Sequence, residues 1–486
     1  MWYIRWKKDI YNNRTKKIDM KITVITPTWN SVKKRWCNEH EKNKKIYTIL
    51  SIFIFLCWTP FLLAFFPGIY GYDAQTHIIQ FFSGEFTTHH PLLYTILFGG
   101  LYKISDILGN HAGRVIYSVL QMMILSGSMA IAIIYLKDIK CPKYMIGLVL
   151  AYYALCPLNG LMSLITTKDT IFAALVVLIY VDLCKNQQQT KLKNVRSIVL
   201  MVLGCLFRNN AVYALALFGV WILMFQRKKN MKWLKKIGIS IMVYLLINVG
   251  LKVGLQAKAT TTAEMWSVPL QQMARVAVET QDEELTEKIT GIIPKYEMYT
   301  SYLADPIKNQ RASFDGDCWK VYVQCVLKHP IVCVKAFADN IEGMWNLKND
   351  PYAENREFII PLTYHNGAPF GAVGFEGKDY ALLMGLREKC VELFSYTGIF
   401  RHKIIALAFR QSFYFWLLII NAIWVSIRSK IHGNHKDISQ DNFANVYIFC
   451  YLFTLMLAPC AATRYFYAIM VCIPIMLVRN FGKLQF

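Results

Sequence analysis

The chain has 486 residues, of which 55% are hydrophobic and only 17% are charged, and its mean hydropathy is +0.31. A soluble protein usually carries about 25% charged residues, so this composition excludes an ordinary soluble enzyme. The formal net charge is +23, but the lysines and arginines lie in short clusters between apolar runs, as topology signals do in membrane proteins. No nucleic-acid-binding motif accompanies them. We therefore predict an all-α polytopic membrane protein that binds membrane lipids and no nucleic acid.

The first 45 residues are rich in lysine and arginine, and the positive-inside rule predicts that they lie in the cytoplasm. No cleavable signal peptide is expected, because this basic segment precedes the first apolar run. The thirteen cysteines show no paired CxxC spacing, so they predict neither a zinc site nor a disulfide framework.

Apolar runs of about 18 to 24 residues recur along the chain, and this is the length needed to cross about 30 Å of hydrocarbon. The runs predict spans over residues 46–66, 113–136, 144–158, 165–184, 195–207, 210–226, 234–255, 404–427, 443–460 and 463–480. One orientation, with both chain ends inside, places every basic loop in the cytoplasm. The apolar segment 91–108 is interpreted as an in-plane or re-entrant helix, because another span there would reverse the later loops. We expect about ten transmembrane helices.

A large insert separates the predicted spans into two sets. Residues 256–402 contain amphipathic helical patches and connections rich in Gly, Pro and Asn, but no apolar run of spanning length. This pattern predicts a mostly helical external domain. The predicted organisation is a basic cytoplasmic segment (1–45), a transmembrane region with the first external loop at 67–112 (46–255), the external domain (256–402) and C-terminal transmembrane helices (403–486).

The first external loop begins with PGIYGYDAQTH, which contains the acid Asp73. Asp73 follows Gly-Tyr and precedes a helical pattern, so it fits a helix N-cap. It also fits a general base held at the membrane surface and aimed at an acceptor hydroxyl. On a helix that starts here, His77 lies one turn after Asp73 on the same face. His77 could then orient the acid, share its proton or complete a metal site.

Two adjacent histidines, His89 and His90, precede Pro91 in the same loop. Proline is favoured at the first position of a helix, so a helix cap is one interpretation of this element. Hydrogen bonding to a substrate and a role in metal binding are the alternatives, although adjacent residues on a regular helix cannot easily bind one metal together. Glu85 is a second, weaker candidate carboxylate.

Three further segments place charged groups at the external ends of predicted spans, where ionisable residues are costly and usually functional. Their candidate donor-binding residues are Lys168, Asp169, Arg208, Asn209, Arg464 and Tyr465. Each segment also has a structural interpretation as a cap, a snorkelling lysine or an ion pair. Because all three are predicted on the same side as Asp73, their cations could together bind a lipid phosphate or pyrophosphate.

Several motifs resemble those of the GT-C superfamily of integral-membrane glycosyltransferases, which use polyprenyl-phosphate-linked sugars. The motifs are the aromatic-Asp step of the first loop, its HHP element, TTKDTIFAALVVL, LFRNNAVYALALF and ATRYFYAIMV. Together with VPLQQMARV in the insert, they are similar to an uncharacterised bacterial family of GT-C-like proteins. The resemblance implies a GT-C-like bundle in the plasma membrane with its active site on the extracytoplasmic side.

The resemblance also implies a mechanism and partners. Asp73 would accept the proton of a cell-envelope glycan acceptor, and the sugar would leave its polyprenyl-phosphate donor with inversion. Arg208 and Arg464, with Lys168 as a further candidate, would stabilise the departing phosphate. The insert would hold sugar or polymer with its aromatic residues, namely Trp266, Trp319, Trp345, Tyr352 and Tyr364. The loop carries a single Asp where many relatives have two acids, so we expect no required metal, with a divalent ion as the open alternative.

Two other functions remain as alternatives to a transferase. A transporter or flippase of lipid-linked sugars would bury charges near the membrane midplane and show internal repeats. The chain instead places its charges at one edge and shows no repeat. A polysaccharide polymerase or ligase would share the lipid donor but would place its key residues in a later and larger loop.

Overall fold

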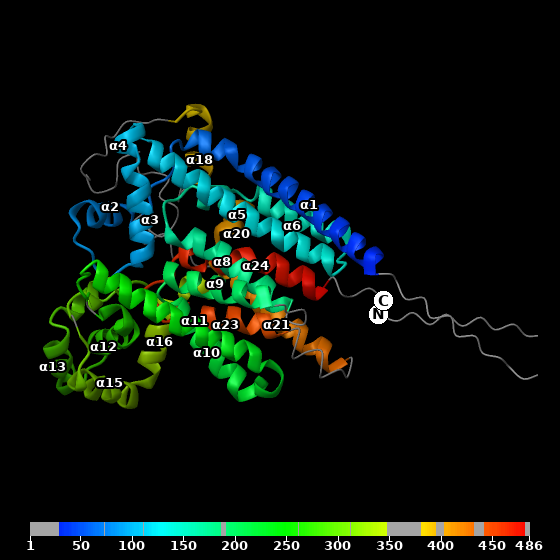
Figure 1. Cartoon of the computed structure of the whole chain (residues 1–486). Helices are drawn as coiled ribbons and strands as arrows, with labels where there is room; N and C mark the ends of the chain where they lie inside the picture. The colour runs from blue at the N-terminus through cyan, green and yellow to red at the C-terminus, as the bar shows by residue number, and fades with distance from the viewer. Residues whose placement is uncertain are drawn as a thin grey trace, which may run out of the picture. The chain divides into compact units, whose positions relative to one another are not determined.

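The computed structural model describes residues 29–71, 73–109, 111–185, 191–260, 262–311, 313–347, 381–394, 403–431 and 442–481. Within these ranges the chain is helical (Figure 1), and extended backbone pairs only in isolated bridges. The prediction of an all-α protein is therefore confirmed for the described part of the chain. The cysteines whose side chains are described are free.

The chain divides into two compact units, Met1–Ile49 and Leu50–Phe486. Helix α1 (Trp29–Ala64) begins in the first unit and continues into the second. Residues 1–28, most of the predicted cytoplasmic segment, lie outside the described residues. The site and its surroundings belong to the second unit.

The centre of the second unit is helix α8, whose sequence is apolar on all sides, as in a helix that is surrounded by others. Its neighbours are α5, α9, α23 and α24 (Figure 1). The helices of this bundle are α5 (Ala112–Asp138), α6 (Lys143–Leu155), α7 (Pro157–Met162), α8 (Lys168–Cys184), α9 (Lys191–Phe207), α10 (Ala211–Trp221), η1 (Ile222–Gln226), α11 (Arg227–Gly254), α20 (Lys403–Phe409), α21 (Gln411–Ile431), α23 (Phe443–Met456) and α24 (Thr463–Phe481).

Four helical stretches among the described residues are long and apolar enough to cross a membrane. They are Asn43–Ala64, Ala112–Asp138, Ala211–Gly254 and Thr463–Phe481. A fifth is gained if the helix pair Gly316–Lys328 and Pro330–Asn340, bent by 104°, counts as one span. These helices support the prediction of a membrane protein, whereas the expected count of about ten spans is not confirmed.

The difference in count comes from helix length and continuity. Three apolar helices in the predicted spans, Lys143–Leu155, Asn194–Phe207 and Phe443–Met456, are shorter than a span requires. The two spans predicted over 210–226 and 234–255 lie in one helical stretch of 44 residues. In that stretch α10 packs against α11, so the chain folds back on itself near the non-helical residue Asn230.

The first loop forms three helices, α2 (Ala74–Ser83), α3 (Leu92–Lys103) and α4 (Ser105–Leu108). Helix α3 has 12 residues, which gives it a length of about 18 Å. This is too short to cross the hydrocarbon layer, in agreement with the interpretation of segment 91–108 as a non-spanning helix. Helix α3 packs against α2 and α5, and so the loop lies on the bundle.

The described part of the insert is also helical and has a core of its own. Around α12 (Ser267–Glu279) pack α13 (Glu283–Ile292), α14 (Asp305–Lys308), α15 (Gly316–Lys328) and α16 (Pro330–Asn340). The shorter elements are η2 (Ala263–Trp266), η3 (Tyr296–Met298), α17 (Glu342–Trp345) and α18 (Met384–Phe394). Tyr352, Tyr364 and the predicted connection at 366–377 lie outside the described residues.

Candidate functional site

The first loop is joined to the start of α8 by backbone pairing. Ile69 forms a bridge with Ile165, and the Gly71 N–H donates to Thr166 Oγ1 at 2.8 Å. A Cβ atom on Gly71 would collide with the Thr166 carbonyl, so only glycine allows this close approach. The pairing brings Asp73 beside the first turn of α8.

The first turn of α8 carries a capping residue and two charged residues. Thr167 is the N-cap, and its Oγ1 accepts a hydrogen bond from the Asp169 N–H at 3.3 Å. This agrees with the interpretation of this segment as a helix cap. Lys168 and Asp169 begin the helix directly after this cap, which sets their positions opposite the loop.

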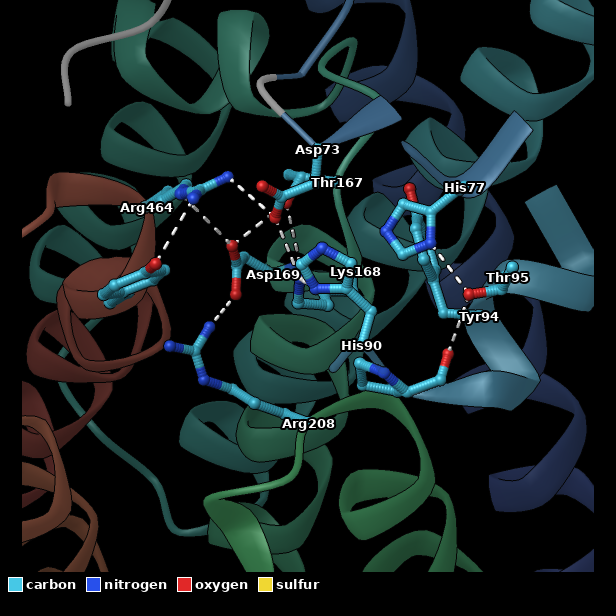
Figure 2. Close-up of polar contacts among 12 residues, drawn as sticks. Asp73, His77, His90, Tyr94, Thr95, Thr167, Lys168, Asp169, Arg208 and Arg464 are labelled. Carbon is cyan, nitrogen blue, oxygen red and sulfur yellow. Dashed lines mark hydrogen bonds and ion pairs between the residues drawn. The ribbon is translucent and has the colours of Figure 1, made fainter. Parts of the chain in front are cut away.

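Five charged side chains form one cluster at this point (Figure 2). Asp73 Oδ2 lies 2.9 Å from Lys168 Nζ and 3.2 Å from Arg464 Nη1. Asp169 forms an ion pair with Arg208, and its Oδ2 lies 4.0 Å from Arg464 Nε. The structure thus brings together residues from the first loop, α8, the end of α9 and the start of α24.

Burial differs across the cluster. The side chains of Asp73 and Arg464 are 16% and 18% exposed, whereas Asp169 is 1% exposed. Asp73 and Arg464 therefore lie at the accessible side of the cluster, and the Asp169–Arg208 pair lies at its buried side.

Asp73 occupies the N-cap position of α2, but its side chain makes no capping hydrogen bond. Burial alone would raise the pKa of its carboxyl group. The Arg464 guanidinium and the Lys168 ammonium outweigh that effect and hold the pKa of Asp73 well below its usual value. Asp73 is accordingly ionised at neutral pH, with its charge directed at cations rather than at the helix.

His77 is fully buried beside this carboxylate. Its Nδ1 lies 2.8 Å from Thr95 Oγ1, while its Nε2 has no hydrogen-bond partner among the described residues. The ring also packs edge-on against Tyr94, with the ring centres 4.7 Å apart. Burial, with the nearby Lys168 charge, lowers the pKa of His77 to about 3, so the imidazole is neutral.

The two histidines before Pro91 have different surroundings. His90 Nδ1 lies 3.3 Å from Lys168 Nζ, and its ring centre is 4.7 Å from that of His77. Burial and the Lys168 charge hold the pKa of His90 well below its usual value. His89 is exposed and meets the His90 ring edge-on, with ring centres 4.5 Å apart, without a hydrogen bond to another described residue.

Asp73, His77 and His90 each offer one ligand atom, and these atoms lie within 4.8 Å of one another. Because His77 is on α2 and His90 precedes α3, the pair avoids the geometric problem of two adjacent histidines. The three residues could therefore hold one metal ion.

Tyr465 and Asn210 support the arginines of the cluster. The Tyr465 ring lies 4.6 Å from the Arg208 guanidinium carbon and 5.0 Å from that of Arg464, and its hydroxyl accepts from Arg464 Nη2 at 3.2 Å. Asn210 Oδ1 accepts from Arg208 Nε at 2.9 Å.

The predicted neighbour Asn209 is exposed and has no polar contact with the described residues. The sequence signal, two adjacent asparagines, could not show which one faces Arg208.

Thr95 was not expected from the sequence, because a single threonine in the apolar pattern of α3 carries no signal of its own. Only its contact with His77 reveals a role. Glu85, the weaker acid candidate, is 72% exposed and pairs with Lys258 at 3.5 Å, so the structure does not bring it to the cluster.

The aromatic residues of the insert pack largely with one another. Trp266 stacks on Phe314 with ring centres 4.8 Å apart and meets Trp319 edge-on at 5.4 Å. Trp345 Nε1 donates to the Ala338 carbonyl at 3.0 Å. A role of these side chains in holding sugar stays a prediction.

The fold and the site define a helical protein with membrane-length helices and a buried cluster of charges and histidines at one end of its bundle. A family model described as a family of unknown function (DUF6020) matches residues 82–368. The match covers more than half of the chain, so the protein belongs to this family. No curated protein matches the chain. The matched range contains Lys168, Asp169 and Arg208 of the cluster, as well as His90, whereas Asp73 and Arg464 flank it.

Proposed function

We propose that the protein is a membrane glycosyltransferase that moves a sugar from a polyprenyl-phosphate donor to a cell-envelope glycan or polymer. Asp73 is the general base, and the helices form a GT-C-like bundle of about ten spans. The observation that carries this proposal is the position of the Asp73 carboxylate, held ionised between Lys168 and Arg464 at the accessible side of the cluster.

The charge balance of the cluster favours an anionic ligand. Among the described residues, Lys168, Arg208 and Arg464 form ion pairs with two carboxylates, those of Asp73 and Asp169, so these five groups carry one net positive charge. Helices α8 and α24 both begin at the cluster, and the partial positive charge of a helix N-terminus adds to the attraction for an anion. A lipid phosphate supplies this charge, and its negative charge grows as the sugar leaves.

The proposed reaction uses the two oxygens of Asp73 differently. Both hydrogen bonds from the cations end on Oδ2, which leaves Oδ1 for the acceptor hydroxyl. Oδ1 accepts the hydroxyl proton as the oxygen bonds to the anomeric carbon of the sugar. The bond between that carbon and the phosphate oxygen breaks, and its electron pair leaves with the polyprenyl phosphate, next to Arg464.

The distribution of basic residues supports an extracytoplasmic site. At the far end of α8, Lys185 pairs with Asp138 at the end of α5. The sequence around Asp138 also contains Lys137, Lys140 and Lys143. Helix α8 has 17 residues, so this basic end lies about 25 Å from Lys168. The positive-inside rule assigns the basic end to the cytoplasm and the cluster to the outside.

The same arrangement favours an enzyme over a transporter. Transporters place their binding sites near the bilayer midplane, at broken helices. Here Lys168 and Asp169 belong to the first turn of α8, and the next charged residue of the helix is Asp182, in its last turn. The charges therefore lie at one end of the bundle, where a lipid headgroup and a water-soluble acceptor can meet.

The test is a transfer assay in membrane vesicles that contain the full chain. Radiolabelled sugar is supplied as its polyprenyl phosphate, and label is followed into cell-envelope polymer. Asp73→Asn should lower the rate by about 10²- to 10⁴-fold, because it removes the base. Asp138→Asn is the matched control, since Asp138 also pairs with a lysine of α8 but at the opposite end, and its rate should stay that of the wild type. An Asp73→Asn protein with full activity would refute the proposal.

A further inference from the structure

We propose that Asp73, His77 and His90 form a binding site for a divalent transition metal of the Zn²⁺ type, at the position where the Lys168 ammonium group lies. The three side chains each direct a ligand atom to a common region, with all of these atoms within 4.8 Å of one another. Two imidazoles and one carboxylate are a ligand set that zinc and its neighbours in the first transition row prefer.

The strongest support is the unpaired nitrogen of His77. This side chain is 0% exposed, and its Nε2 has no hydrogen-bond partner among the described residues. A buried polar atom without a partner is rare in proteins and costs stability. A metal ion bound to Nε2 would satisfy it.

The opposite side of the His77 ring fits a tautomer that leaves Nε2 able to bind metal. In the tautomer with the ring proton on Nδ1, His77 donates to Thr95 Oγ1 at 2.8 Å, the Thr95 hydroxyl donates to the Pro91 carbonyl at 3.4 Å, and the lone pair is on Nε2. A hydrogen bond of this kind from the second ring nitrogen is what usually orients a metal-binding histidine.

Lys168 shows that the site accepts a cation. Its Nζ contacts Asp73 Oδ2 at 2.9 Å and His90 Nδ1 at 3.3 Å (Figure 2). An ammonium group only donates hydrogen bonds, so the His90 Nδ1 that it contacts carries a lone pair. A divalent ion in this place would meet the same two lone pairs and, in addition, Nε2 of His77.

Metal binding requires a modest rearrangement. Zinc binds nitrogen and carboxylate oxygen at about 2.0–2.2 Å, so its ligand atoms lie about 3–3.5 Å apart. The most distant pair here must therefore close by about 1 Å, and the flexible Lys168 side chain must withdraw. Lysine and metal compete for one position, and this competition provides the test.

Three protein ligands leave one coordination position open, as in catalytic zinc sites. A water molecule or an acceptor hydroxyl in that position would lose its proton more readily. Since the metal replaces Lys168 on one oxygen of Asp73, the second oxygen can still accept this proton. This catalytic role depends on the proposed transferase reaction, whereas metal binding itself does not.

The experiment titrates the purified full-length protein, in detergent and without sugar donor, with Zn²⁺ by calorimetry. Co²⁺ replaces Zn²⁺ in a second titration, in which visible absorption reports coordination. We expect one equivalent of metal to bind. His77→Gln and His90→Gln should each weaken binding at least tenfold, and Thr95→Val should weaken it less. His329→Gln is the control, since His329 also faces a carboxylate, that of Asp282, at 3.3 Å, and should bind metal as the wild type does.

Lys168→Met gives the decisive result when it stays folded, as judged by thermal unfolding, because a gain in affinity for one equivalent is then expected at this site. Removing the competing ammonium group should tighten metal binding at least tenfold. The inference is overturned if neither the wild type nor Lys168→Met binds one equivalent, or if His77→Gln binds as tightly as the wild type. Normal metal binding by a protein without sugar transfer would refute the transferase and leave the metal site standing.

Discussion

Two of the regions that bury cations have opposite charge balance. In the insert, Lys308 contacts both Glu264 and Asp305, so one cation faces two acids. Its acids are 44% and 45% exposed, while Lys308 is only 6% exposed. In the cluster at the start of α8, three cations face two acids, and Asp169 and Arg208 are both almost fully buried.

The difference distinguishes an ion pair that stabilises the fold from a group of charges whose burial needs another explanation. Acids at a surface retain water, so the Lys308 group costs little to form. Two charges removed from water together cost more than their attraction returns unless further contacts compensate. In the α8 cluster Asp169 and Arg208 are buried despite this cost, and the five charged groups together carry one net positive charge. This charge is expected for the anion-binding site that we propose.

The largest effect should follow from breaking the buried pair. Asp169→Asn leaves the Arg208 guanidinium buried without a carboxylate partner, which should cost about 3–5 kcal/mol of stability. The measurement is thermal unfolding of the detergent-solubilised protein. The double variant Asp169→Leu/Arg208→Met should regain most of the lost stability, because apolar side chains can replace a buried pair. The proposed sugar transfer should be lost in both the single and the double variant. If transfer returned together with stability in the double variant, the role of the pair would be only structural.

A smaller effect is expected in the insert. Lys308→Met leaves Glu264 and Asp305 unpaired, but both acids are nearly half exposed and remain hydrated. The loss of stability should be about 1 kcal/mol, measured by the same unfolding assay, and transfer per folded molecule should not change. A loss as large as that of Asp169→Asn would remove the distinction between the two regions.

The smallest effect concerns Asp315, the N-cap of α15, whose Oδ1 accepts from the Cys318 N–H at 3.0 Å. This hydrogen bond, with the contact to Arg311, lowers the pKa of Asp315 from 3.8 to about 2. Because the folded-state pKa is the lower one, the stabilisation is complete above the unfolded-state value near 4 and is lost as the pH falls to about 2. Unfolding of wild type and Asp315→Asn, compared between pH 5 and pH 2, should differ in slope only over this window. Identical slopes would contradict the role of the cap.

Most charged members of the cluster could be identified from the sequence. Lys168, Arg208 and Arg464 interrupt or end apolar runs, and the cost of a charge at that depth does not depend on how the helices pack. Asp73 could be identified because it is a charged residue shortly after the first apolar run, next to glycines that allow a turn. The all-α class followed equally from the length of the apolar runs.

Contacts that depend on tertiary packing could not be predicted. His77 and His90 belong to different segments, and their approach depends on the turn at Gly84, whose φ is 72°, and on the packing of α2 against α3. The choice between Asn209 and Asn210 depends on the rotation of the chain at the end of α9. Hydropathy likewise marked apolar runs but could not show where each helix ends, as in Ala211–Gly254, where the chain folds back near Asn230.

The cluster draws on the beginning and the end of the chain, with Asp73 and Arg464 separated by 391 positions. During synthesis the earlier segments supply Asp73, Lys168, Asp169 and Arg208, which carry equal numbers of positive and negative charges. Arg464 arrives last, with α24, and only then does the cluster gain its surplus positive charge. The phosphate affinity that we propose would therefore arise only once α24 has been made, because a chain that still lacks Arg464 carries a balanced set of charges at this place.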